Sequence, residues 1–139
     1  MAKRCETFDH TADVGLAASG DSLAELFEAL AEGLADLICP TGQVEARQVR
    51  AVHVEAEDLE ALAVDFLTEV MVTIESRRFV LAKAVVTDVS RTSVDAELAG
   101  EALDPARHEF RTEVKAVTYH QLHVAQQDGR WTARVILDI

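Results

Sequence analysis

Two segments of the chain have apolar residues at the spacing of one helix face, and they constrain the fold more than any other feature. The first starts at a capping box, residues 22–25, and its apolar stripe runs to Leu37 before Pro40. The second follows the acidic pair Glu57-Asp58, which suits a helix N-terminus, and ends near Arg77-Arg78. We therefore predict two amphipathic helices, each of which buries one face.

The β-rich segments come mostly as hairpins. Residues 79–89 and 93–99 flank a short polar turn, and a loop is expected from Gly100 to Phe110. At the end of the chain, Lys115–Gln126 is predicted as one strand, which turns at Asp128-Gly129 into Arg130–Leu137. Shorter strands are expected around residues 4–8, 14–18 and 44–54. Hairpins without βαβ alternation predict an α+β fold, with both helices packed on one face of a largely antiparallel, hairpin-rich sheet.

Composition narrows the class of protein. The 139 residues fit a single domain, 1–139, and an aromatic content of 5% requires an aliphatic core. The net charge of −12 repels phosphate backbones, so direct binding of nucleic acid is not expected. Cys5 and Cys39 lack metal-ligand spacing, and no apolar run is long enough to cross a membrane. These features predict a cytoplasmic protein with reduced thiols and no membrane association.

The spacing of the histidines indicates which of them could bind a metal ion together. His120 and His123 stand three apart on a predicted strand, which sends them to opposite faces and makes them poor co-ligands for one ion. His53 and His108 are isolated, and we expect both at the surface. Nucleophile-elbow, P-loop and dinucleotide-binding glycine patterns are absent from the sequence.

The segment Asp9–Asp13 concentrates two carboxylates and an imidazole directly after the first strand. A carboxylate neighbour can orient the ring of His10 and raise its basicity, as in a functional site. The alternative is a turn in which Asp9 and Asp13 bond to local backbone amides. Spacing alone leaves both interpretations open.

The end of the chain, Asp138-Ile139, offers further oxygen ligands. If the fold brings Asp13 to this strand end, the side chains and a terminal carboxylate would form an oxygen-only site suited to Ca²⁺, Mg²⁺ or Mn²⁺. The alternative is a frayed, solvated terminus. Lys115 would then lie near the cluster, where it could pair with Asp13 or bind a triphosphate as a point charge.

Four segments together resemble the archease family. They are residues 9–15, 57–62, 113–120 and 131–139, and the similarity extends over nearly the whole chain. The resemblance implies a cytosolic accessory protein, not an enzyme, for the RtcB-type RNA-splicing ligase. In that family, archease promotes guanylylation of the ligase histidine by GTP and allows multiple turnovers in tRNA splicing and RNA repair.

The family's functional residues carry over onto this sequence. The resemblance implies a divalent metal held by Asp13, Asp138 and the main-chain carboxylate of Ile139. It assigns the functional lysine to Lys115, and His10 receives a supporting role. The ligase would bind GTP, and this protein would act on the nucleotide only through the ligase. Two other functions are kept open: a stand-alone metal-dependent phosphoester hydrolase, and a general chaperone-like interaction module.

Overall fold

The computed structural model describes residues 3–10 and 13–139, apart from the side chains of Asp9 and His10. Two helices and eight strands confirm the predicted α+β class. In chain order the elements are β1 (Arg4–His10), β2 (Asp13–Gly20), α1 (Leu23–Ile38), the 3-10 turn η1 (Thr41–Gln43), β3 (Gln48–Glu55), α2 (Leu59–Glu75), β4 (Phe79–Val89), β5 (Ser93–Ala102), β6 (Ala116–Val117), β7 (His123–Gln127) and β8 (Arg130–Asp138).

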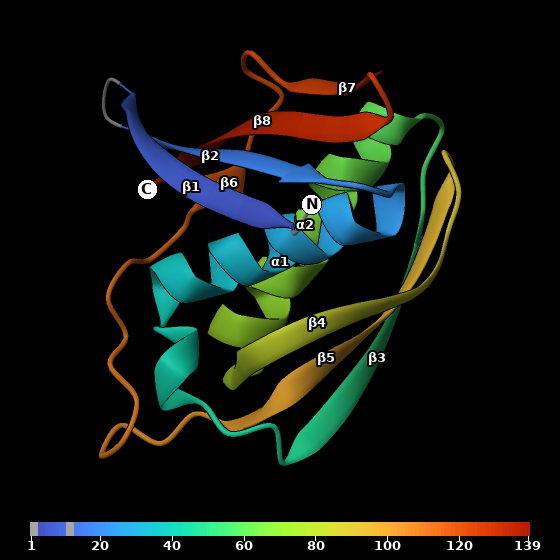
Figure 1. The fold of residues 1–139 in the computed structure, drawn as a ribbon. Coiled ribbons are helices and arrows are strands. Elements are labelled where there is room, and N and C mark those ends of the chain that lie inside the picture. The colour runs from blue at the N-terminus through green and yellow to red at the C-terminus, as the bar shows by residue number, and fades with distance from the viewer. Residues whose placement is uncertain (1–2, 11–12) are drawn as a thin grey trace.

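The strands form two antiparallel sheets instead of the expected one. The first has the order β1-β2-β8-β6, with β7 also paired to β8, and the second has the order β3-β5-β4. Figure 1 shows α1 and α2 between the two sheets. The buried face of α1 is wider than the predicted apolar stripe. It includes Ala29, Ala31 and Ala35 beside the leucines. A helix that is buried over so wide an arc needs a sheet on more than one side.

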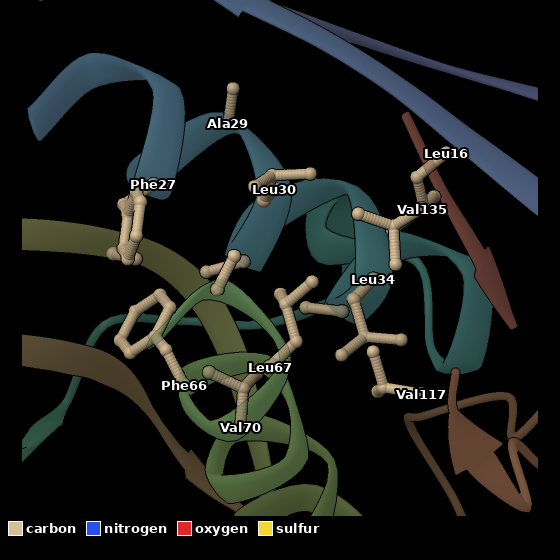
Figure 2. Close-up of a cluster of buried hydrophobic side chains, with 14 of the residues drawn as sticks. Leu16, Phe27, Ala29, Leu30, Leu34, Phe66, Leu67, Val70, Val117 and Val135 are labelled. Atoms are coloured by element: carbon tan, nitrogen blue, oxygen red, sulfur yellow. The ribbon is translucent and has the colours of Figure 1, made fainter. Parts of the chain in front are cut away.

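Most side chains in the core between the helices and the sheets are aliphatic, as the composition predicts, and a few phenylalanine rings lie among them. Figure 2 shows Phe27 of α1 facing Phe66 of α2, and their ring centroids are 5.4 Å apart. Leu34 lies in the same cluster, together with Leu16 from β2 and Val135 from β8. The core therefore joins both helices to the sheet that contains the two ends of the chain.

Both helices begin at the predicted residues. Ser22 caps α1, and its hydroxyl accepts a hydrogen bond of 3.1 Å from the Glu25 amide. The Glu25 carboxylate accepts from Asp21 N–H at 2.8 Å, one residue earlier than in the standard capping box. Asp58 caps α2 through the Ala61 amide, also at 2.8 Å. Within the described residues, no helix is long and apolar enough to cross a membrane.

The prediction of one strand over Lys115–Gln126 is wrong. β6 and β7 both pair with β8, but residues 119–122 between them have no register partner on it. Thr118 still bonds to β8 before the chain departs, since its amide and its hydroxyl both donate to the carbonyl of Ile136, at 3.0 and 2.9 Å. Gln121 then takes a positive φ of 52°. The final hairpin turns at Asp128-Gly129 as predicted, with φ values of 55° and 78°.

The carboxylates of α1 cover the outer edge of β4. Glu32 accepts from the Ala84 amide at 3.0 Å, and Glu28 accepts from the Val86 amide at 2.8 Å. Lys3 bridges both carboxylates, at 3.2 and 3.3 Å. Backbone donors that an edge strand would otherwise expose are therefore bonded to the neighbouring helix.

Candidate functional site

The register of β2 and β8 places Asp13 directly opposite Asp138. At this end of β8, Leu137 is buried in the core and the next residue, Asp138, is exposed. Because opposite residues of an antiparallel pair share a face, both aspartates lie on the outer face of the sheet. The Cβ atoms of such a pair are typically about 5 Å apart, close enough for two carboxylates to share one cation.

The last residues of β1 lie beside the start of β2. His10 is the register partner of Asp13, and Asp9 is the partner of Val14. The side chains of Asp9 and His10, and residues 11–12 between the strands, lie outside the described part of the structure. The supporting role of His10 therefore remains a prediction that rests on the family resemblance.

Lys115 lies beside the end of β8. Its amide donates to the carbonyl oxygen of Asp138 at 2.7 Å, and the next residue, Ala116, is the register partner of Asp138. On its other side the buried Val114 donates its amide to Glu75 at 2.7 Å, which fixes the segment to the end of α2. The pKa of Glu75 is raised, mainly by partial burial of its carboxyl group and to a smaller extent by the negative charge of Glu113. The hydrogen bond from the Val114 amide opposes this shift. The structure thus brings Asp13, Asp138 and Lys115 to one end of the sheet.

The donor set at this end fits a hard divalent cation only in part. The side chains of the described residues include no group of three His, Cys, Asp or Glu arranged to hold a metal ion. Asp13 and Asp138 supply two carboxylates, and Ile139, which follows Asp138 directly, is 37% exposed. Main-chain or incoming oxygen atoms would have to complete an oxygen-only shell of the kind that Ca²⁺, Mg²⁺ and Mn²⁺ accept.

An aromatic ring fastens β1 to the strands that contain the two aspartates. Phe8 lies across Gly15, where an added Cβ would be 2.0 Å from the ring's Cζ atom. The guanidinium of Arg134 lies over the same ring, 4.2 Å from its centroid. Ile136, opposite Gly15, is only 2% exposed although it faces outward. The sequence did not lead us to predict this contact. Gly15 was the available signal, because a glycine inside a strand often marks a close approach by another group.

His108 is not at the surface, as its isolation in the sequence suggested. Its side chain is fully buried, and Nε2 lies 3.0 Å from a carboxylate oxygen of Glu101. The Nδ1 atom accepts from the Asp104 amide at 2.8 Å, so Nε2 carries the proton that points to Glu101. Glu101 also accepts from Arg107 at 2.6 Å and from the Glu45 amide at 2.8 Å. This cluster anchors the long loop that leads towards Lys115.

Acid is expected to weaken this anchor. The hydrogen bond from Arg107, followed by that from the Glu45 amide, lowers the pKa of Glu101 from 4.5 to about 2. A carboxylate whose pKa is lower in the folded state adds stability above the unfolded-state pKa and loses it as the pH falls towards the folded-state value. Urea unfolding should therefore show a loss of stability between about pH 5 and pH 2 that is smaller in Glu101→Gln. Glu97→Gln, at an exposed position of β5, should keep the wild-type profile.

The remaining histidines form no shared site. His53 is exposed, as predicted, and it lies between Glu55 at 2.6 Å and Asp95 at 2.7 Å. The hydrogen bonds to Glu55 and then to Asp95 raise the pKa of His53. His120 and His123 are both exposed, and they now belong to a turn and to β7 instead of one strand.

Comparison with known proteins gives a consistent result. Residues 5–139 match the model of the Archease protein family. The chain is 43% identical to the protein archease of Pyrococcus abyssi, with 99% of both chains covered, and 37% identical to that of Methanosarcina acetivorans, with 100% and 98% covered. These relatives are matched over nearly their whole length.

Solved structures agree with the sequence comparison. The solution structure of protein 1598 from Methanobacterium thermoautotrophicum superposes with a TM-score of 0.81 at 33% identity, covering 97% of this chain and 98% of that one. A crystal structure from Thermotoga maritima, described as an archease and possible chaperone, has a TM-score of 0.66 at 20% identity, with 96% of both chains covered, and supports the fold. From the family match, the curated relatives and the shared fold, we conclude that this chain belongs to the archease family.

Proposed function

We propose that this protein is an accessory activator of an RtcB-type RNA-splicing ligase. It would promote GTP-dependent guanylylation of the ligase histidine and allow multiple turnovers, acting in the cytoplasm without a catalytic reaction of its own. The observation that supports this proposal is the register of β2 and β8, which pairs Asp13 with Asp138 beside Lys115. These are the residues to which the family resemblance assigns a metal site and a functional lysine.

The chemistry of this end of the sheet suits work on a nucleotide. Asp13, Asp138 and the terminal carboxylate of Ile139 would hold Ca²⁺, Mg²⁺ or Mn²⁺, which when bound supplies charge neutralisation for phosphate oxygens. Lys115 is exposed and presents an ammonium group on a flexible stem. Asp138 is held in place from both sides, since Asp13 pairs with it on β2 and the Lys115 amide binds its carbonyl oxygen.

Guanylylation of the cognate ligase tests the proposal directly. The ligase is incubated with GTP and either Mg²⁺ or Mn²⁺, and the nucleotide bound to it is measured with and without this protein. Wild-type protein should accelerate the reaction, while Asp13→Asn and Asp138→Asn should lose roughly tenfold or more of that acceleration because each removes a charged ligand. Asp88→Asn removes an equal charge from an exposed position of β4 and should behave as wild type.

Calorimetric titration with the metal alone separates ligand loss from misfolding. Both site variants should melt like the wild type in the absence of metal and bind the ion more weakly. Residues appended after Ile139 would convert its carboxylate to an amide, and metal affinity should then fall while the fold is retained. Unchanged affinity in the extended protein would remove Ile139 from the site.

Two outcomes would replace the proposal with another function. Turnover of a phosphoester by the purified protein alone would indicate a metal-dependent hydrolase. Variants that lose thermal stability but still activate the ligase would indicate a structural role for the carboxylates, as in a chaperone-like interaction module. No acceleration of the cognate ligase by the wild-type protein, in either metal, would contradict the activator role.

A further inference from the structure

A groove of about 420 Å³ crosses the outer face of the first sheet, away from the paired aspartates. Short side chains form its floor, among them Ala17 and Ser19 of β2 and Thr132 of β8. Longer side chains rise on both sides, with Arg4 on β1 and Arg134 on β8. The groove exists because β2 and the facing Thr132 of β8 have short side chains, while Arg4 and Arg134 beside them have long ones.

The charges in this groove oppose the charge of the whole protein. Among the described residues that line it, the single carboxylate belongs to Glu6, and that group already forms an ion pair with Arg4. Arg134 has no hydrogen bond or ion pair within the described part of the chain, and its guanidinium is in contact with the ring of Phe8. His123, the register partner of Arg134, is exposed beside it. The groove therefore has an excess of positive charge in a chain of net charge −12.

We propose that this groove binds a phosphate group. The ring of Phe8 covers one side of the Arg134 guanidinium and limits its freedom, while its N–H donors are left for a ligand. Ser19 and Thr132 supply hydroxyl groups from the floor of the groove. The Ser19 oxygen already accepts from Arg130 at 3.0 Å, so its own proton remains available for donation. Hydroxyl groups and a guanidinium that line one groove match the needs of a phosphate oxyanion.

This site is separate from the candidate metal centre. Arg134 precedes Asp138 by four residues on the same face of β8, a distance of about 13 Å at the rise of a β-strand. The groove also contains none of the residues assigned to the metal. The proposal therefore does not depend on activation of a ligase, and each can fail without the other.

Titrations observed by amide NMR on the whole protein test the site. The probes are inorganic phosphate, a nucleoside monophosphate and a short single-stranded RNA, each compared with sodium chloride at equal ionic strength. We expect saturable shifts at Ser19, Thr132 and Arg134 with at least one probe. Arg134→Gln should weaken that binding about tenfold or more, since it removes both the charge and the paired donors. The probe that binds most tightly identifies the source of the phosphate group.

Arg50→Gln is the matched control, because Arg50 also lies over a phenylalanine ring, that of Phe79 at 4.6 Å, but on the second sheet. It removes the same charge and the same kind of contact, and it should bind every probe as the wild type does. Shifts no larger than those caused by sodium chloride would overturn the proposal. So would equal losses of affinity in the two variants, which would indicate a response to net charge alone.

Discussion

Replacing Phe66 with alanine should lower the free energy of unfolding by about 3–5 kcal/mol, the range for deletion of a buried aromatic ring. The side chain is fully buried and faces Phe27 across the contact between α1 and α2. Its removal leaves a cavity at the centre of the core. Neither helix can move into that cavity without losing its packing contacts with a sheet. Urea unfolding measured by far-ultraviolet circular dichroism gives this value directly.

Phe110→Ala provides the matched control for that measurement. The same atoms are deleted, but Phe110 is 38% exposed and lies in the loop before Lys115. Surface substitutions generally change stability by no more than about 0.5 kcal/mol. A loss below about 1 kcal/mol for Phe66→Ala, or equal losses for the two variants, would mean that the helix interface does not stabilise the fold as described.

Gly100→Ala should be the most damaging of the conservative glycine substitutions. A Cβ at this position of β5 would lie 1.8 Å from the carbonyl oxygen of Val80, a backbone atom that cannot rotate away. The adjacent pairing of β4 is already irregular, with a register shift between Leu81 and Lys83. We expect a loss of about 3 kcal/mol, at the upper end of the usual cost of overpacking.

Gly42→Ala tests whether that cost comes from crowding. An added Cβ at Gly42 has no heavy atom within 4 Å, so the same change of residue should leave stability almost unaltered. Thermal unfolding of the two variants in parallel separates the two positions. If both proteins melt at the wild-type temperature, that result would contradict the close approach of β4 to β5 described at Gly100.

Local sequence signals predicted the helices well, because a cap and an apolar stripe are both read within one short segment. Ser22 and Asp58 cap the helices through the amides expected of such residues. Gly100 misled the prediction, since a glycine that usually signals a loop is here required inside β5 by the approach of β4. The division into two sheets was also missed, because alternation of apolar residues does not specify which strands pair.

The sequence predicted the positions of some residues of interest correctly and those of others wrongly. The pairing of Asp13 with Asp138 joins the two ends of the chain, and the family resemblance, not residue spacing, led to its prediction. The structure brings the positions together, and metal binding by them remains a prediction. His108 was misplaced because an isolated histidine is usually exposed; its carboxylate partner, Glu101, lies in a segment that was predicted as a loop.

The carboxylates that cover β4 have a consequence for self-association. A sheet with two open edges can add a strand at each, and copies of a chain can then join into an open-ended fibre. In the second sheet, Glu28 and Glu32 occupy the Val86 and Ala84 amides at one edge, which leaves β3 as the edge where another strand could add. Pairing of two copies through β3 would use up both open edges, so growth through this sheet would stop at a dimer.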